Sequence, residues 1–205
     1  MAGDLTPYDG GDLEPDEDYD GYLFDGVTFA DADAGHCHFL DCSFAGASFD
    51  GGTLRKARFT DVTLQDTRFV ACDLAETGWQ DVTLASCALA GVQAFSAAMR
   101  RVTFRDCKLD SVNFRGGELT EVTFENCVLR DAEFGGATLR QVSFGGCTLV
   151  DADFAKATCT EVDLRGAELG ITGGYDALRG ATIDSVQLVS LAPLLARHLG
   201  IIVAD

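Results

Sequence analysis

The sequence lacks any apolar run approaching the roughly 18 residues that a membrane-spanning helix needs. Its first 21 residues, MAGDLTPYDGGDLEPDEDYDG, contain neither the basic stretch nor the apolar stretch of a signal peptide. We therefore expect a soluble protein of the cytoplasm.

Basic residues are scarce, above all near the N-terminus. The 205 residues include 33 Asp and Glu but only 15 Lys and Arg, which gives a formal net charge of −18. No Lys or Arg precedes Arg55, whereas residues 1–54 contain 13 acidic residues. Such a chain repels nucleic acid and attracts basic surfaces. We expect a basic protein partner and no direct binding of nucleic acid.

Familiar catalytic signatures are missing as well. The sequence contains no glycine-rich phosphate-binding loop, no G-x-S-x-G motif and no convincing catalytic dyad. We therefore predict that the protein is not an enzyme and that it uses no cofactor.

What the sequence does contain is an unbroken five-residue repeat. A Phe or Leu stands at nearly every residue number ending in 4 or 9 from Phe24 to Leu169, which makes 30 positions in one frame. The exceptions are Ala34, Trp79, Ala94, Met99 and Cys159. A period of five matches neither the helical period of 3.6 nor the strand period of 2, so the repeat indicates an architecture of its own.

Each repeat combines a short extended side with a corner. The residue two places before each Phe or Leu is small, the residue between them is mostly polar, and the next two positions are rich in Gly, Asp, Asn and Ser. The first three positions alternate inward, outward and inward as in a strand, and the last two suit a turn. A chain that bends every five residues winds into a coil that pairs its backbone with the coils above and below.

The alternation of Phe and Leu indicates the number of sides. Between Phe104 and Phe154 the two types alternate strictly, with a period of ten residues. An even number of sides stacks like on like, and four sides fit best. Thirty repeats then form about 7.5 coils, a rod roughly 36 Å long at a spacing of about 4.8 Å. The predicted fold class is an all-β solenoid.

Stretches such as ADFAK (152–156) and AELGI (167–171) fit the motif A(D/N)LXX. On these residues the chain resembles the pentapeptide-repeat family over residues 22–171. The resemblance implies a right-handed quadrilateral β-helix, which agrees with the four sides inferred from the Phe and Leu pattern.

The cysteines follow the repeat. Seven of them, Cys37, Cys42, Cys72, Cys87, Cys107, Cys127 and Cys147, occupy the small inward position, and Cys159 takes the place of a Phe or Leu. Because Val and Ala alternate with them there, we predict buried, reduced thiols. An alternative is an enzyme or metal sensor built on HCHFLDC (36–42), whose two His and two Cys are zinc ligands by type. In the coil these side chains diverge, so we expect no metal.

Two segments flank the repeat. Residues 1–21 are acidic, and because they offer little apolar surface to bury we predict a flexible arm; attraction of a basic partner is a second possibility. In residues 172–205, Asp184 and Gln187 have the spacing of a helix capping box. Pro193 should kink or divide that helix, and residues 201–203 should form a short apolar strand.

We predict that this helix caps the open end of the coils and also joins two chains. The residues predicted for the dimer interface are Val186, Val189, Leu191, Leu194, Leu195, Leu199, Ile201, Ile202 and Val203.

Residues 20 apart should stack when four repeats form a coil. One corner column then contains Asp41, Asp61, Asp81, Arg101, Glu121, Gln141 and Glu161. Turn preference alone favours Asp at corners. Like charges about 4.8 Å apart nevertheless repel by around 1 kcal/mol in water, so a row of them indicates a use. Duplex DNA also presents regular negative charge, and a rod with an acidic stripe can occupy a basic DNA channel. We predict that Asp41, Asp61, Asp81, Glu121 and Glu161 bind the partner.

The rod and terminal helix also resemble the gyrase-binding, quinolone-resistance branch of the family. That resemblance implies a DNA mimic that forms a homodimer, binds a type II topoisomerase (DNA gyrase) and protects it from inhibitors, conferring antibiotic resistance or self-resistance. The alternative is a scaffold of the same fold that binds another basic protein.

Two features depart from a uniform stripe. Arg100, Arg101 and Arg105 form a basic cluster in the middle of the rod, and Phe95 stands at an outward corner beside the small Ala94. There we predict a local bulge that lets Phe95 fill the space left by Ala94.

Overall fold

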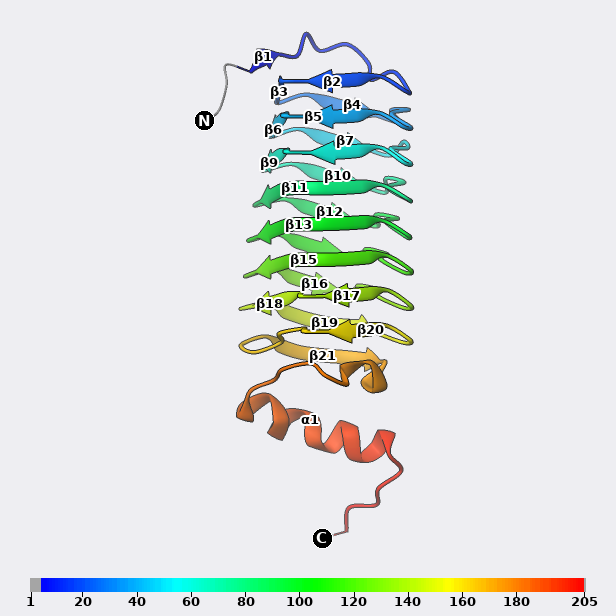
Figure 1. Cartoon of the computed structure of the whole chain (residues 1–205), viewed down its shortest axis with the longest axis vertical. Helices are drawn as coiled ribbons and strands as arrows, with labels where there is room; N and C mark the ends of the chain where they lie inside the picture. The colour runs from blue at the N-terminus through cyan, green and yellow to red at the C-terminus, as the bar shows by residue number, and fades with distance from the viewer. Residues whose placement is uncertain (1–4, 205) are drawn as a thin grey trace.

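The structure of the protein, a computed structural model, describes residues 5–204. The chain winds into a parallel β-solenoid of about eight coils, followed by one α-helix at the C-terminal end (Figure 1). Among residues 5–204, no helix combines the length and the apolar character needed to span a bilayer.

The strands belong to two sheets. The 13-stranded sheet contains β1 (Thr6–Pro7), β2 (Asp18–Asp20), β3 (Tyr22–Asp25), β5 (His38–Leu40), β6 (Ser43–Ala45), β8 (Arg58–Thr60), β9 (Thr63–Gln65), β11 (Gly78–Ala85), β13 (Ala98–Arg105), β15 (Glu118–Glu125), β17 (Thr138–Arg140), β18 (Ser143–Gly145) and β20 (Thr158–Thr160). The 8-stranded sheet contains β4 (Thr28–Ala30), β7 (Ser48–Asp50), β10 (Arg68–Val70), β12 (Ala88–Ala90), β14 (Lys108–Asp110), β16 (Val128–Arg130), β19 (Thr148–Asp153) and β21 (Glu168–Gly173).

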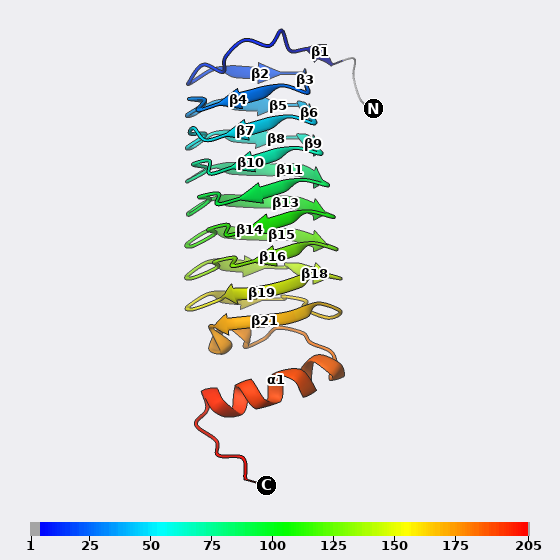
Figure 2. The ribbon, with the colours of Figure 1, turned by 180° about the vertical axis from the view of Figure 1, so that it is seen from behind.

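The pairing register confirms the four-sided coil. Phe104 pairs with Phe124 and Leu109 pairs with Leu129, a separation of 20 residues in each case. We number the sides in chain order. The first side contains β5 and β8, the second contains β6 and β9, and the third is the 8-stranded sheet seen in Figure 2. The fourth side consists of turns joined by single bridges between successive coils, such as the bridge at positions 93 and 113.

Every corner uses one backbone conformation. From residue 16 to residue 166, each residue whose number ends in 1 or 6 has a positive φ, and 22 of these residues are not glycine. This left-handed region is costly for most side chains but is accessible to Gly, Asn and Asp. The predicted corners are therefore confirmed, and their Gly- and Asp-rich composition has a conformational cause.

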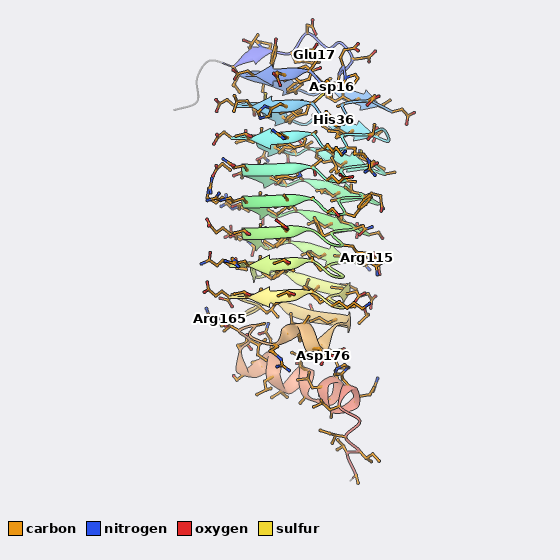
Figure 3. All side chains as sticks on the ribbon, turned by 45° about the vertical axis from the view of Figure 1, so that its right-hand side comes forward. Asp16, Glu17, His36, Arg115, Arg165 and Asp176 are labelled. Carbon is orange, nitrogen blue, oxygen red and sulfur yellow. The ribbon has the colours of Figure 1, made fainter. Side chains whose placement is uncertain are left out.

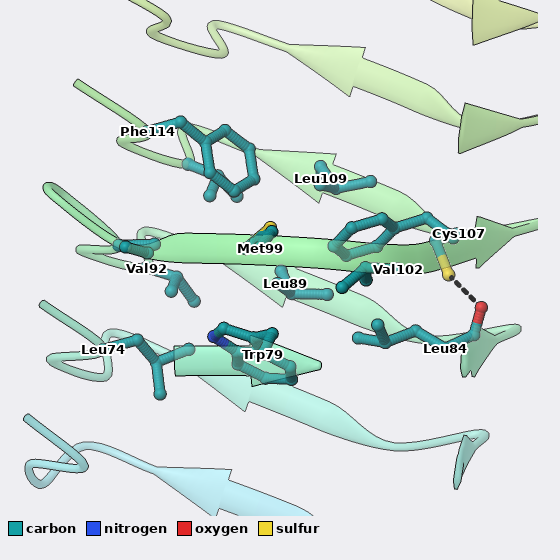
Figure 4. Packing of buried hydrophobic residues seen from close by; sticks show 14 of the residues in the cluster. Leu74, Trp79, Leu84, Leu89, Val92, Met99, Val102, Cys107, Leu109 and Phe114 are labelled. Carbon is teal, nitrogen blue, oxygen red and sulfur yellow. Dashed lines mark hydrogen bonds between the residues drawn. The ribbon is translucent and has the colours of Figure 1, made fainter. Parts of the chain in front are cut away.

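Stacked side chains form the core. The ring centroids of Phe104 and Phe124 lie 4.8 Å apart, and those of Phe124 and Phe144 lie 4.9 Å apart. Cys107 is buried as predicted, and its thiol donates a hydrogen bond to the carbonyl oxygen of Leu84 at 3.5 Å (Figure 4). Seven cysteines are buried, and only Cys159 is half-buried. The core is thus continuous along the rod.

The described part of the acidic N-terminal segment is built into the solenoid rather than separate from it. β1 pairs with β3 and β2 pairs with β5, so residues 5–21 continue the coil. Leu13 and Tyr19 are buried, and the ring of Tyr8 lies 4.6 Å from that of Phe24. These apolar side chains, spaced among the acids, give the segment surface to bury, so the prediction of a flexible arm with too little apolar surface is corrected for residues 5–21. Residues 1–4 of that predicted arm lie outside the described residues.

The C-terminal segment closes the other end. After β21 come the 3₁₀-helix η1 (Tyr175–Leu178) and the helix α1 (Ser185–His198). The predicted capping box is confirmed, because Asp184 accepts from the backbone of Gln187 while the Gln187 side chain accepts from the backbone of Asp184. Gln187 also donates to the carbonyl oxygens of Leu164 and Ala167 at 2.5 and 2.7 Å. The carbonyl of Leu164 also accepts from the backbone of Ala167, so the helix adds a second hydrogen bond there and one to the carbonyl of Ala167 at the end of the last coil.

Three local predictions were wrong. Pro193 lies inside α1, which continues through it as one helix, so the division into two helices was wrong, whereas the kink stays a prediction. Residues 201–204 form no strand, because no neighbouring strand is there to pair with them. Phe95 causes no bulge. Gln93, two residues before it, bridges to residues 20 positions away in the coil before and the coil after, as the regular register requires. Phe95 is instead half-buried, and the guanidinium carbon of Arg55 lies 5.3 Å from its ring centroid.

Candidate interaction surfaces

The predicted acidic residues lie on one edge of the rod, between the first and second sides. We call Asp41, Asp61, Asp81, Glu121 and Glu161 the acidic column; Arg101 and Gln141 complete the same edge. All seven have φ between 49° and 56°, so their side chains leave the backbone in the same direction. The coil repeat spaces them by roughly 4.8 Å, or by multiples of it. Four of the five carboxylates are exposed, and Asp81 is half-buried.

Backbone conformation explains only part of this column. A left-handed corner favours Asp, so Asp41, Asp61 and Asp81 satisfy a local requirement as well as carrying charge. Glu has no such preference, yet Glu121 and Glu161 occupy the same conformation. The corner between the second and third sides contains only two acids, Asp66 and Asp106, among Gly, Ser and Asn. The acidity of the column thus exceeds what the turns require.

An ion pair interrupts the column. The guanidinium of Arg101 donates to both oxygens of the Asp81 carboxylate, at 2.5 and 2.6 Å. These hydrogen bonds lower the pKa of Asp81 and raise the pKa of Arg101. Asp81 is therefore neutralised by its neighbour. Two free segments remain, Asp41 with Asp61 on the N-terminal side and Glu121 with Glu161 on the C-terminal side.

The basic cluster predicted in the middle of the rod is not a single patch. Arg101 is on the edge and bound to Asp81, whereas Arg105 lies on the second side and donates to Glu125 at 2.8 Å. Arg100 lies on the first side. Among residues 5–204, no carboxylate lies within 4.0 Å of its guanidinium nitrogens.

The HCHFLDC segment does not gather its metal-binding side chains. The thiols of Cys37 and Cys42 point into the core and donate to the carbonyl oxygens of Glu14 and Tyr19. His38 faces outward, with Nε2 3.3 Å from the Thr60 hydroxyl, and His36 is exposed at a corner (Figure 3). Within residues 5–204 no group of three or more His, Cys, Asp or Glu side chains is arranged to hold a metal ion.

The C-terminal segment exposes apolar side chains. Val186 and Val189 on α1, and Leu199, Ile201, Ile202 and Val203 beyond it, are all more than half exposed. Leu194 and Leu195 are half-buried. Leu191 is only 1% exposed, because it turns toward its own chain, so its place in the predicted dimer interface is corrected. We call the other predicted interface residues the terminal apolar surface; they are Val186, Val189, Leu194, Leu195, Leu199, Ile201, Ile202 and Val203.

A groove on the first side was not predicted. It forms where two hollows meet and share Arg58, Gly78 and Ala98 in their lining. The outward residues of that side, 20 apart, are His38, Arg58, Gly78, Ala98 and Glu118. Gly78 and Ala98, two of the smallest residue types, are neighbours in this column, and this pair is the feature of the sequence from which the groove could have been predicted.

Comparisons with known proteins identify the repeat. A family model for the pentapeptide repeat region matches residues 77–154, and a model for pentapeptide repeats in nine copies matches residues 34–78. A search of curated proteins found no match.

The chain is also similar to solved structures of other proteins. A trypsin-treated form of QnrB1, a plasmid-mediated fluoroquinolone resistance protein, is 19% identical, with a TM-score of 0.50 over 97% of this chain and 96% of that one. A pentapeptide repeat protein from the thylakoid lumen of Arabidopsis thaliana is 16% identical, with a TM-score of 0.46 over 59% of this chain and 74% of that one. At such identities the likeness to QnrB1 shows the fold alone.

Proposed function

The chain belongs to the pentapeptide-repeat family, and on that premise we propose that it is a non-enzymatic DNA mimic that binds a type II topoisomerase, DNA gyrase, and protects it from inhibitors. The observation that carries the proposal is the acidic column, a row of exposed carboxylates along one edge of a regular rod. Each of the four free carboxylates, those of Asp41, Asp61, Glu121 and Glu161, takes the place of a backbone phosphate in the DNA channel of the enzyme.

The charge density of the rod supports this role. Residues 5–171 contain 29 acids and 13 Lys and Arg, so a net charge of −16 is spread over eight coils. At about 4.8 Å per coil, or roughly 38 Å, this amounts to about one charge per 2.4 Å. Duplex DNA carries one charge per about 1.7 Å of its axis. Because residues 1–54 contain 13 acids and no Lys or Arg, the density is highest at the N-terminal end. That end, with Asp41 and Asp61, is where we expect the strongest attraction to a basic channel.

We also propose that two copies join through the terminal apolar surface. Val189 is 74% exposed and Ile202 is 92% exposed, and neither has another apolar surface of its own chain to cover it. A second copy offers the same surface in return, which is how two-fold interfaces are built. Sedimentation or light scattering at micromolar concentration tests this. Two copies are expected for the wild type and one for Val189→Lys/Ile202→Lys, whereas a monomeric wild type contradicts the dimer.

The decisive experiment measures gyrase supercoiling and its inhibition by a fluoroquinolone, with and without the protein. Asp41→Asn/Asp61→Asn removes two charges from the column while keeping a residue type that accepts the left-handed corner. Asp131→Asn/Asp151→Asn is the matched control, because both aspartates are exposed at corners of the same conformation on a different edge. We expect the column variant to bind gyrase several-fold more weakly and the control to bind like the wild type.

The outcomes separate the alternatives. If the wild type neither binds gyrase nor changes its inhibition at tens of micromolar, the proposed function is wrong. If the two double variants lose affinity equally, net charge rather than the acidic column carries the binding. Affinity should also fall steeply with salt, because the attraction is between exposed charges.

A further inference from the structure

We infer that the groove on the first side of the solenoid receives an acidic side chain of the topoisomerase, so that the rod presents, within its acidic surface, two arginines without a carboxylate partner in the described part of the chain. This inference rests on the proposed function. It adds a second element of recognition, since a partner then needs a carboxylate between two basic regions.

The groove exists because its floor lacks side chains. Gly78 on β11 and Ala98 on β13 stand at outward positions of neighbouring coils, with Arg58 before them and Glu118 after them in the same column. A Cβ added to Gly78 would lie 3.8 Å from Cγ of Arg58, so the arginine stem forms the wall next to the floor. These strands face the viewer in Figure 1.

The backbone beneath the groove is held firmly. In the same two coils, Trp79 and Met99 replace the usual Phe or Leu (Figure 4). The Trp79 ring stacks on Phe59 with centroids 4.2 Å apart, and its indole nitrogen donates to the buried hydroxyl of Thr77 at 2.8 Å. Two of the five departures from Phe or Leu thus lie beneath the groove.

Charge decides what the groove can hold. Arg58 and Arg100 both line it, and among residues 5–204 neither has a carboxylate oxygen within 4.0 Å of its guanidinium. Arg55, Arg101, Arg105, Arg115, Arg130 and Arg165 are all paired in this way. A guanidinium binds a carboxylate through two parallel hydrogen bonds, and the small side chains of the floor leave room for one beside the arginines.

The acids around the groove define its boundary. Glu118 and Glu121 line the groove in the coil that follows Arg100, and Glu121 belongs to the acidic column. Asp18 and Glu76 line the other hollow, where Glu76 is 3.8 Å from Lys56. An incoming carboxylate is therefore directed to the arginines at the centre and repelled at both ends. DNA has no counterpart to these two arginines. The groove therefore lets the protein distinguish gyrase from a partner whose surface is only basic.

The test uses a variant for which the groove and a uniformly acidic surface predict opposite changes in affinity. Arg58→Glu/Arg100→Glu makes the rod more acidic, so a uniform acidic mimic would bind a basic channel more tightly. If the groove binds a carboxylate, the same variant should weaken the affinity for gyrase by about tenfold or more, about 1.4 kcal/mol or greater. The matched control is Arg68→Glu/Lys108→Glu on the third side, which makes the same change in charge at two exposed outward positions. The control should retain or increase the affinity.

A second variant leaves all charges in place. Ala98→Phe fills the floor of the groove, and Ala88→Phe adds the same ring at the outward position of the third side. The first should weaken binding several-fold and the second should not. If wild-type protein binds gyrase and Arg58→Glu/Arg100→Glu binds as tightly or more tightly, the groove inference is overturned while the proposed function stands. If wild-type protein does not bind, both are overturned.

Discussion

Replacing Phe124 by Ala tests whether ring stacking stabilises the rod. Phe124 has no exposed surface and lies between Phe104 and Phe144, with centroid distances of 4.8 and 4.9 Å. It also meets Phe134 edge to face at 6.5 Å. Truncation to Ala therefore opens a cavity between two coils and removes both stacked contacts.

The expected loss is large compared with the stability of a domain. Truncating a buried Phe to Ala costs about 3–5 kcal/mol, and the two stacked neighbours place Phe124 near the upper end of that range. Phe124→Leu should cost about 1 kcal/mol, because the same column already contains Leu64 and Leu84. Phe124→Asp would place an unpaired charge in the core, and we expect it to abolish soluble folding.

Urea denaturation followed by circular dichroism measures these differences. With a slope of about 2 kcal/mol per molar urea, the midpoint of Phe124→Ala should fall by about 2 M and that of Phe124→Leu by about 0.5 M. A loss below about 1 kcal/mol for Phe124→Ala, or a normal melting curve for Phe124→Asp, would refute the account of the core.

Three further predictions concern the backbone, the thiols and the terminal helix. Gly52 has φ +77°, and an added Cβ would clash with the backbone of Ala32, whereas Gly46 has φ +62° and open space around it. Gly52→Ala should therefore destabilise the fold more than Gly46→Ala, by about 1 kcal/mol or more in the same urea assay. Cys159 is the one half-buried cysteine and the other seven are buried, so a thiol reagent at pH 8 should modify Cys159 first. Exposure decides this order, because burial raises the pKa of Cys159 as well as that of Cys72. Fast reaction of several thiols in the folded protein would contradict this. Hydrogen bonds from the backbone of Gln187, Gly166 and Val186 lower the pKa of Asp184, so its contribution to stability is present above the ordinary value of 3.8 and is lost as the pH falls through the lowered value. Asp184→Ala should accordingly lower the urea midpoint clearly at pH 7 and much less at pH 2, and an equal loss at both values would show that the carboxylate charge does not stabilise the helix.

The architecture could be predicted because every repeat meets the same physical requirement. A position that is inward in one coil is inward in all of them, so 30 nearly identical pentads average out any local exception. The N-terminal segment was misjudged for the same reason. Its last residues keep the 20-residue register, with Tyr19 opposite Phe39, but before them the order depends on single residues such as Leu13 and Tyr8 that pack on the open end of the coils. Composition alone does not reveal such contacts.

The outward surface obeys no comparable rule. The sequence placed Asp81 and Arg101 in one column, yet only the structure shows that they bind each other and divide the acidic column into two segments. The groove likewise depends on what stands next to Gly78 in space, and its neighbours in space are 20 residues away in sequence.

The two kinds of acid in the column allow its conformational and electrostatic causes to be separated. An Asp at a left-handed corner helps the backbone turn, so Asp61→Asn should leave stability nearly unchanged, since Asn accepts the same conformation. Glu121 gives the backbone no such help, so its presence there points to its charge. If the column binds a basic channel, Glu121→Gln and Asp61→Asn should lower the affinity for gyrase by similar amounts. The left-handed corner favours Asp but not Glu, so an equal loss would come from the charge alone. If instead only turn formation selected these acids, neither substitution should change the affinity for gyrase.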